Sequence, residues 1–201
     1  MEGGGFFIAI EGIDGSGKTT HSKKLARWLN KHGVKSIYTR EPTNGDIGRI
    51  LRRMARKKSV DPKVEALLFA ADRLEHLNKV IQPYVKKGYV VISDRYVYSS
   101  LAYQTVTTRD PEWVKEINKF AYKPDLTLLL DLEPRIGLSR VKRNRTRFEE
   151  ESFLEKVRQE YLRLAGIDGL KIIDASKSIG EVFQEIVREV AEHLKNKVTL
   201  L

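Results

Sequence analysis

The chain has 201 residues, 41% of them hydrophobic and 32% charged, which is the composition of a globular protein long enough for one α/β domain. It has no cysteine, which excludes disulfides and thiolate metal sites, and no apolar stretch near the ~20 residues of a membrane-spanning helix. The N-terminus lacks the basic and apolar regions of a secretory signal, so we expect a cytoplasmic enzyme without membrane contacts.

The net charge of +10 favours a polyanionic partner, and two classes of partner fit it. A nucleic-acid-dependent ATPase would bind oligonucleotides tightly and in a salt-sensitive way. An enzyme would instead bind small phosphorylated ligands. Part of the charge can also belong to helix surfaces with mixed Lys and Glu that form ion pairs. The first motif in the chain favours small-molecule partners and no nucleic acid.

A predicted strand over residues 6–11 runs directly into a phosphate loop. Residues 12–19 match the pattern G-x-x-x-x-G-K-[ST] in full, and a predicted helix over 18–31 follows. Glycines there let backbone N–H groups converge on a polyphosphate, and the helix N-terminus adds partial positive charge. Lys18 is expected to reach the β- and γ-phosphates of ATP, and the Thr19 hydroxyl to hold Mg²⁺. The residues expected to bind ATP are Gly12, Ile13, Asp14, Gly15, Ser16, Gly17, Lys18 and Thr19.

The second predicted strand, residues 36–39, closes with Thr39-Arg40-Glu41-Pro42. Pro42 fixes a rigid turn whose backbone can line a pocket wall, although a plain turn between strand and helix is the alternative. A predicted helix over 46–57 follows. Its basic run, residues 52–58, is interpreted as a solvated helix face, with Arg52 as a candidate exception.

A long predicted helix over 63–87 carries Phe69 and Arg73, which are four residues apart and share a face. An aromatic ring with a guanidinium one turn away suits a nucleobase, through stacking and hydrogen bonds to a carbonyl edge. The alternative for Phe69 is an ordinary core position. The histidines, His21, His32, His76 and His193, are interpreted as ordinary surface or helix residues.

The predicted strand over 90–94 delivers Asp94 to its carboxyl end, and Arg95 follows directly. Mg²⁺ keeps several waters and takes few carboxylates, so one aspartate suits a water-mediated metal contact. Arginine suits a bidentate grip on a phosphate. An ordinary strand-end salt bridge is the alternative, but the phosphate loop upstream favours a shared site.

The remaining predicted elements are strands over 126–131 and 171–174 and helices over 134–143, 150–164 and 179–195. Continuous apolar runs indicate strands buried on both faces. Alternating strands and helices predict an α/β fold with a doubly wound, mostly parallel five-stranded sheet flanked by helices, as in P-loop NTPases. We expect one domain over 1–201, with ligands at the carboxyl ends of the strands.

The ordered set of motifs resembles the thymidylate kinase family, P-loop enzymes that phosphorylate dTMP with ATP. Besides the segments already named, the matching pieces are residues 99–100, 102–104, 123–126, 147–149 and 174–176. They run from residue 6 to about residue 195 in the family's order. The resemblance implies the nucleoside monophosphate kinase fold, ATP and Mg²⁺ as cofactors, transfer of the γ-phosphoryl group to dTMP, and a homodimer.

The resemblance also implies roles around the sugar and phosphate of dTMP. Asp14 would accept a hydrogen bond from the 3′-hydroxyl, and Arg95 would clamp the phosphate. Asp94 would serve the water shell of Mg²⁺. Tyr103 would crowd the sugar C2′ and disfavour a ribose 2′-hydroxyl.

Four further residues take roles at the base by the same resemblance. Phe69 would stack on thymine, and Arg73 would reach its O4 atom. Ser100 would make a polar contact to the base, and Pro42 would back the base near its methyl group. These positions argue against a kinase of adenylate, deoxynucleosides or shikimate, which is the nearest rival reading.

Some thymidylate kinases carry an arginine in the phosphate loop, directly after the aspartate, where this chain has Gly15. Similar enzymes that lack it supply an arginine from a lid. The arginine-dense residues 140–149 are therefore expected to form a short lid. The candidate arginines are Arg140, Arg143, Arg145 and Arg147. By position, Arg140 would pack on adenine, Arg143 or Arg145 would reach the γ-phosphate, and Glu149 would help at the phosphoryl or metal centre. A solvated basic helix end is the alternative.

Overall fold

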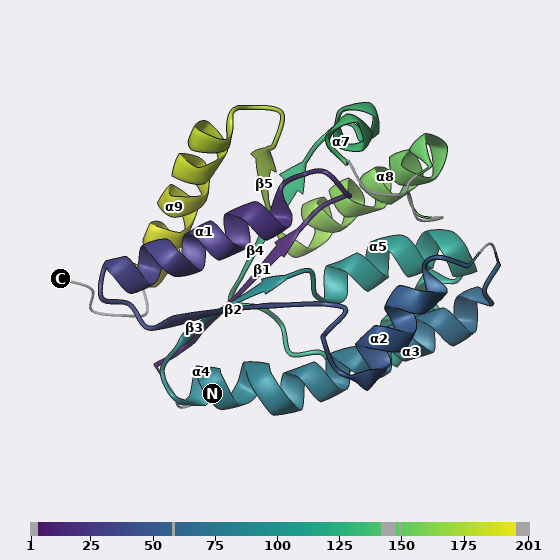
Figure 1. Ribbon diagram of the computed structural model, residues 1–201, viewed down its shortest axis with the longest axis horizontal. Helices are drawn as coiled ribbons and strands as arrows, with labels where there is room; N and C mark the ends of the chain where they lie inside the picture. Colours follow the sequence, from purple (N-terminus) through teal and green to yellow (C-terminus); the bar gives the residue numbers. More distant parts are fainter. Residues whose placement is uncertain (1–3, 58, 142–147, 149, 196–201) are drawn as a thin grey trace.

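The computed structural model describes residues 4–57, 59–141, 148 and 150–195. Its centre is a five-stranded sheet in the order β2-β3-β1-β4-β5 (Figure 1), and each neighbouring pair is parallel. The predicted fold class is confirmed. The strands are β1 (Phe6–Glu11), β2 (Ser36–Arg40), β3 (Val90–Asp94), β4 (Leu126–Asp131) and β5 (Lys171–Asp174), so only β2 runs one residue past its prediction.

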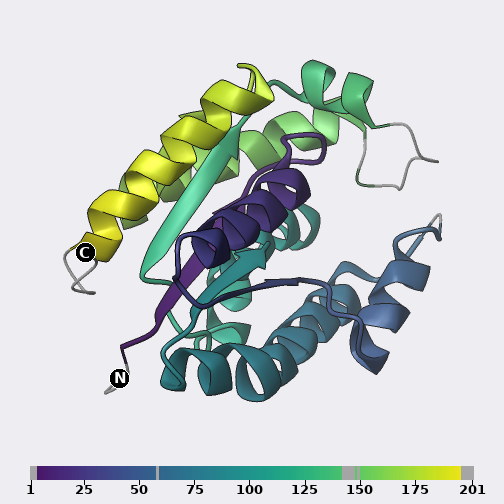
Figure 2. The same cartoon turned by 60° about the vertical axis from the view of Figure 1, so that its left-hand side comes forward.

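Alternate residues of the central strand β1 face two different helical layers. Helices α1 (Lys18–Lys31) and α9 (Ile179–Lys195) lie along one face of the sheet (Figure 2). Phe6, Ile8 and Ile10 pack in one cluster with buried side chains of these helices. Phe7 and Ala9 point to the opposite face. Every residue of β1 is buried, which explains why the strand has no polar position before Glu11.

Helices from the middle of the chain cover that opposite face. Two clusters fill it, one under the long helix that precedes β3 and one between the helices that follow β3 and β4. The elements that supply them are α3 (Pro62–His76), α4 (Gln82–Lys86), α5 (Val97–Thr108) and α8 (Glu151–Asp168). The sheet is therefore wound on both sides, as predicted.

The segment predicted as one helix over 63–87 is α3 and α4 joined by a π-helical turn, Leu77–Ile81. Asp61 caps its start, because its side chain accepts hydrogen bonds from the N–H groups of Lys63 and Val64. Pro83 has no N–H to donate back into the helix, and the wider turn lies just before it.

Two helices between β3 and β4, α5 and α6 (Pro111–Ile117), have no counterpart in the predicted elements. Helix α5 is rich in aromatic and β-branched residues, which have modest helix propensity. It is also buried on several sides, so it lacks the single apolar stripe by which a surface helix is recognised.

The other helices differ from prediction mainly at their C-terminal ends. Helix α2 (Asp46–Met54) ends in tight turns before residue 57, and α7 (Pro134–Arg140) ends where Val141 adopts an extended conformation. Helix α8 runs to Asp168 and stops at Gly169, whose φ of 72° is left-handed. In the part of the chain that the structure describes, no helix is long and apolar enough to cross a membrane.

Candidate active site

The phosphate loop connects β1 to α1 at the carboxyl edge of the sheet. Gly17 precedes the helix in a left-handed conformation, with φ of 90°, and no side chain caps the first turn of α1. The N–H groups at this helix start are therefore left open toward an anion. By contrast, the start of α5 at the same edge is capped by Glu11, which accepts from the N–H groups of Tyr96 (2.8 Å) and Ser99 (3.2 Å).

The glycine at position 15 is required by close packing against α7. Its φ is 82°, and a Cβ atom built there would lie 2.1 Å from the backbone oxygen of Gly137. A Cβ atom on Gly137 would in turn lie 2.5 Å from the backbone oxygen of Asp14. An arginine cannot occupy position 15 without moving α7, which gives a physical reason why this chain has no arginine in its phosphate loop.

Lys18 is buried, and its ammonium folds back to donate a hydrogen bond to the backbone oxygen of Ile13 at 2.7 Å. Burial and, secondarily, the positive charge of Arg95 lower the pKa of Lys18 to about 8. The carboxylates of Asp14, Asp94 and Glu11 act in the opposite direction but do not offset the burial.

The carboxyl ends of β1 and β3 are adjacent, with Ile10 in register with Asp94. Thr19, at the start of α1, donates a hydrogen bond from its hydroxyl to the Asp94 carboxylate at 2.5 Å. A hydroxyl paired with one carboxylate fits a Mg²⁺ ion that keeps most of its waters. Among the described residues there is no cluster of three or more His, Asp or Glu that would form a metal cage made of protein alone.

Arg95 follows β3 in a left-handed conformation, with φ of 71°, an uncommon conformation for a residue other than glycine. Its guanidinium donates to Asp14 at 2.7 Å and to the Ser99 hydroxyl at 3.1 Å. It also lies 5.0 Å above the centroid of the Tyr103 ring. These contacts aim a fixed planar cation over the phosphate loop, the orientation that a phosphate clamp requires.

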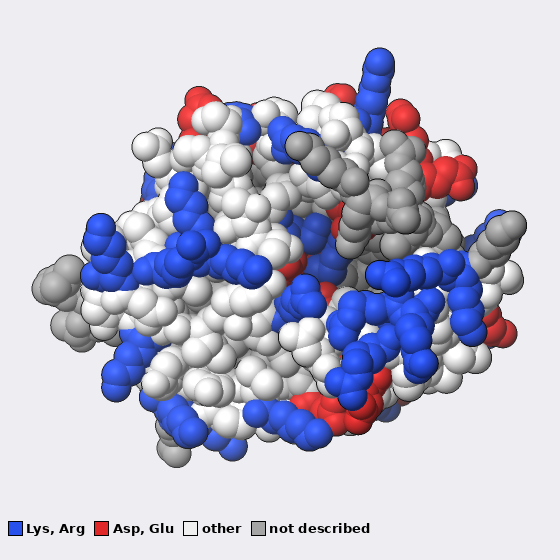
Figure 3. Space-filling model, viewed as in Figure 1, with Lys and Arg blue, Asp and Glu red and all other residues white. Residues whose placement is uncertain are grey.

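A cavity of about 1130 Å³ opens at this edge of the sheet. Figure 3 looks onto the hollowed face, where Lys and Arg side chains gather beside α2; Arg40, Arg52 and Arg56 line the cavity there. The residues predicted to form the site that line it are Asp14, Gly15, Ser16, Gly17, Lys18, Thr19, Pro42, Phe69, Arg73, Asp94, Arg95, Ser100, Tyr103 and Arg140. Gly12 and Ile13 belong to the loop but do not line the cavity.

One side of the cavity is a wall made by α3 and α5. Phe69 is half-buried on it. Pro42, which follows β2 after a cis peptide bond, lines the same cavity. The Ser100 hydroxyl lines the same wall and is buried with no hydrogen-bond partner among the described residues. A buried hydroxyl without a partner is costly unless a ligand or water satisfies it, so this position suits a polar ligand atom.

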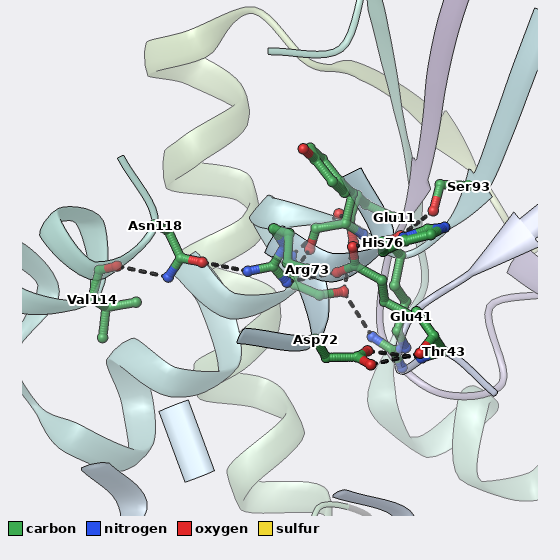
Figure 4. Close-up of polar contacts among 12 residues, drawn as sticks. Glu11, Glu41, Thr43, Asp72, Arg73, His76, Ser93, Val114 and Asn118 are labelled. Atoms are coloured by element: carbon green, nitrogen blue, oxygen red, sulfur yellow. Dashed lines mark hydrogen bonds and ion pairs between the residues drawn. The ribbon is translucent and has the colours of Figure 1, made fainter. Parts of the chain in front are cut away.

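Arg73 is only 1% exposed, although it lines the cavity. Its guanidinium forms an ion pair with Glu41 at 2.8 Å, donates to the backbone oxygen of Tyr96 at 3.1 Å and donates to the Asn118 amide oxygen (Figure 4). The neighbouring Asp72 accepts from both the backbone N–H and the hydroxyl of Thr43. Helix α3 is thus tied to the end of β2 and to the loop after it.

The other end of the cavity lies between α1, α7 and the loop from β5 to α9. Arg140 donates to the backbone oxygen of Ala175 at 3.0 Å, which places its guanidinium beside that loop. His21 lies in α1 and is 3% exposed, and burial lowers its pKa to about 4, so its ring is neutral at physiological pH. His21 and His76 lie in helices as interpreted, but both are buried, so the surface alternative is wrong for them.

Glu11, for which the sequence predicted no role, supports the site from behind without lining the cavity. It is fully buried, and besides capping α5 it accepts from the hydroxyls of Ser99 at 2.6 Å and Tyr161 at 3.1 Å. Burial raises its pKa, although these hydrogen bonds and Arg95 act in the opposite direction. An acidic residue that closes an otherwise apolar strand was the signal that could have identified it.

Four predicted lid residues, Arg143, Arg145, Arg147 and Glu149, lie outside the described residues, so their positions in the site are not assigned. Arg52, the candidate exception in the basic run, lines the cavity and donates to the backbone oxygens of Pro42, at 3.1 Å, and of Thr43. Its basic neighbour Arg53 is exposed, in agreement with a solvated helix face.

Comparison with known proteins gives one consistent result. A family described as "Thymidylate kinase" matches residues 10–186. A protein of Pyrococcus abyssi named "Probable thymidylate kinase" is 45% identical over 200 residues, covering 94% of this chain and 98% of its own. A protein of Pyrobaculum aerophilum with the same name is 46% identical over 196 residues, covering 96% and 97%. One from Staphylothermus marinus is 43% identical over 196 residues, covering 96% and 98%.

Proposed function

The chain belongs to the thymidylate kinase family, enzymes that transfer the γ-phosphoryl group of ATP to dTMP to give ADP and dTDP, and we propose that this transfer takes place in the cavity at the carboxyl edge of the sheet. The observation that carries the proposal is the joint lining of one cavity. The phosphate loop with Lys18 and Arg95 forms one side, and the wall with Phe69, Arg73 and the unpartnered Ser100 hydroxyl forms another.

At the phosphate side, the residues position two anions and offset their repulsion. The loop N–H groups and Lys18 would hold the β- and γ-phosphates of ATP, and Arg95 would clamp the phosphate of dTMP. Thr19 and Asp94 would hold Mg²⁺, which neutralises charge on the phosphates when bound. The dTMP phosphate is itself an anionic nucleophile, so the transfer needs no general base.

At the base side, the proposed contacts follow from the wall that α3 and α5 build. Phe69 would stack on thymine, and Arg73 would donate to its O4 atom. Ser100 would satisfy its hydroxyl on the base, and Pro42 would lie near the methyl group. Tyr103, buried and packed on Arg95, would leave no room for a ribose 2′-hydroxyl, while Asp14 would accept from the 3′-hydroxyl.

The adenine side and the lid complete the proposal. Arg140 would pack on adenine, where its contact with Ala175 supports it. The lid over 140–149 and the roles of Arg143 and Arg145 stay predictions from the sequence, as does one domain over 1–201. A cytoplasmic location also stays a prediction.

We further propose a homodimer that forms through α3. Val64, Leu67 and Leu74 are large apolar residues of this helix that are 41–51% exposed, and their spacing places them along one side of it. Sedimentation equilibrium should give twice the 23.1 kDa mass of the chain. A Leu67→Glu variant should be monomeric, and a wild-type monomer at micromolar concentration would contradict the proposal.

The decisive test of function is ADP release measured with dTMP, dUMP, dCMP, dGMP, AMP and UMP as acceptors. We expect dTMP to have the highest kcat/KM of the panel. A preference for AMP would instead support an adenylate kinase. Oligonucleotide-stimulated hydrolysis of ATP without transfer to any acceptor would support a nucleic-acid-dependent ATPase.

A further inference from the structure

We propose that His76 is a positioning residue for base recognition: it holds Glu41, and Glu41 holds the guanidinium of Arg73 in the orientation that reads the base. This inference rests on the proposed function, because it assigns a purpose to the wall at which the base would bind. His76 itself does not line the cavity, so it touches neither substrate and acts only through Glu41.

Arg73 is anchored from several directions at once. Glu41 pairs with one terminal nitrogen at 2.8 Å, and the backbone oxygen of Tyr96 accepts from the same nitrogen at 3.1 Å. Asn118 accepts at the other terminal nitrogen, and its own amide donates to the backbone oxygen of Val114 at 2.8 Å, which fixes which end of the amide faces Arg73 (Figure 4). The guanidinium plane is therefore set by the protein before any base arrives.

Glu41 uses its two oxygens on two different partners. One faces Arg73, and the other lies 3.0 Å from Nδ1 of His76. The carboxylate and both partners are buried, with side chains 1–3% exposed. Among the described residues, no other cationic side chain lies within salt-bridge distance of Glu41, which directly follows β2. Without His76 the second oxygen would lose its partner, and the carboxylate that anchors one side of Arg73 could rotate away from it.

The hydrogen-bond pattern assigns a tautomer to His76. The Glu41 carboxylate only accepts, so Nδ1 must carry the proton. Nε2 lies 2.6 Å from the hydroxyl of Thr39, which can donate to it. A neutral ring therefore satisfies both neighbours, and the single negative charge of Glu41 stays matched to the single positive charge of Arg73.

The orientation of Arg73 matters because pyrimidine bases differ at the edge that it would face. Thymine presents a carbonyl oxygen at C4, which accepts from a guanidinium, whereas cytosine presents an amino group, which cannot. A guanidinium fixed in place discriminates between them, because it cannot turn its donors away from the wrong base.

The alternative role for His76 is that of a buried polar residue that only stabilises the packing of α3 on the sheet.

Two substitutions separate these roles by mimicking one ring nitrogen each. The side-chain amide of asparagine reaches the position of Nδ1, so H76N keeps a donor for Glu41. The amide of glutamine reaches the position of Nε2, so H76Q keeps the contact with Thr39 and loses the contact with Glu41. His193 offers a matched control, since it also lies in a helix, α9, and its one hydrogen bond among the described residues is to the backbone oxygen of Glu189.

The experiment measures KM for dTMP, KM for ATP and the ratio of kcat/KM for dTMP to that for dCMP in each variant, together with the melting temperature. We expect H76Q to raise KM for dTMP about tenfold, the change for one lost hydrogen bond to a charged group, and to lower the dTMP:dCMP ratio. KM for ATP should stay within about twofold of the wild type. H76N should restore both the KM for dTMP and the ratio, and H193Q should match the wild type.

Equal losses in H76N and H76Q, or a fall in melting temperature with unchanged KM values and ratio, would overturn the proposal and leave His76 a structural residue. If H76Q does not fold, H76L, which fills a similar volume and removes both contacts, takes its place with the same expected kinetics. The wild-type acceptor panel keeps the two proposals apart. A wild-type enzyme that prefers another acceptor overturns the proposed function, whereas a dTMP-specific enzyme whose H76Q variant behaves like H76N overturns only the role of His76.

Discussion

The phosphate side and the base side of the cavity are built in different ways. The phosphate side comes from one continuous segment, residues 12–19, joined by two residues that end or follow the neighbouring strand β3. Its donors are backbone N–H groups and two cations held by short contacts, such as Lys18 on the oxygen of Ile13 at 2.7 Å. The base side draws on three separate elements, α3, α5 and the end of β2, and on a buried network behind them.

This difference predicts how each side fails. A substitution on the phosphate side removes charge at the transferring group and should lower kcat. A substitution on the base side removes binding that is equal in the ground state and the transition state, so it should raise KM for dTMP and leave kcat and ATP binding nearly unchanged. A phosphate-side variant that mainly raises KM for dTMP, or a base-side variant that mainly lowers kcat, would contradict this distinction.

The largest effect is expected from Lys18→Ala. It removes the ammonium from the transferring phosphate, and we expect kcat to fall by at least ~10³-fold while the fold is retained. Steady-state kinetics and circular dichroism check this. The exposed Lys31 in the last turn of the same helix is the control, and Lys31→Ala should keep wild-type kinetics. Near-normal kcat in the folded Lys18→Ala protein would remove Lys18 from the mechanism.

The next effect concerns the predicted lid. Because Gly15 packs on Gly137 and leaves no room for an arginine, charge on the γ-phosphate should be met from residues 140–149. We expect Arg143→Ala or Arg145→Ala to lower kcat by at least ~10²-fold, with KM for dTMP little changed. Arg163 is the control, because it is an exposed arginine of α8 whose one ion-pair partner in the described part of the chain is Glu160. Wild-type kcat in both single variants and in the double variant would contradict the lid mechanism.

A base-side variant should change KM for dTMP and not kcat. Phe69→Ala removes the stacking surface, which is worth roughly 1–3 kcal/mol per base, so KM for dTMP should rise about 5- to 150-fold. KM for ATP should change little. Phe120 is the control, because it is a partly buried aromatic residue that packs against the cluster around Phe7 and does not line the cavity, so Phe120→Ala should leave both KM values near those of the wild type. If both KM values rise in proportion in Phe69→Ala, Phe69 is a core residue and not a base-stacking one.

The same contrast explains what the sequence allowed one to predict. The strands, the sheet type and the phosphate loop follow from local patterns, because a loop of eight contiguous residues carries its own geometry. Phe69 and Arg73 could be predicted as a pair because they share a helix face. The partners of Arg73 could not be predicted, since they come from positions 41, 96 and 118, which no periodicity links to position 73.

The helix and the buried residues that the sequence did not predict were hidden for a related reason. Helix α5 supplies Ser100 and Tyr103 to the base side, yet burial on several sides hides its period. Glu11 carries a weak signal as the acidic end of an apolar strand, but His76 looks ordinary in the sequence, because a buried imidazole is recognised by its partners and not by its neighbours along the chain. Such partners are tertiary contacts, and only the structure places them together.

The smallest predicted effect is a pH dependence that belongs to the phosphate side alone. Burial lowers the pKa of Lys18 to about 8, so the cationic form that binds polyphosphate is lost as pH rises through this value. Between pH 7 and 8.5 the protonated fraction falls about fourfold, and kcat/KM for ATP should fall by the same factor. The last phosphate ionisation of both nucleotides has a pKa of about 6, so it is about nine-tenths complete at pH 7 and contributes little in this window. Once ATP is bound, its negative charge raises the pKa of Lys18, so kcat at saturating ATP and kcat/KM for dTMP measured there should stay nearly flat. A kcat/KM for ATP that is constant to pH 9 would contradict this prediction. It would show that Lys18 keeps the ordinary pKa of a lysine, so that other groups in the loop offset the effect of its burial.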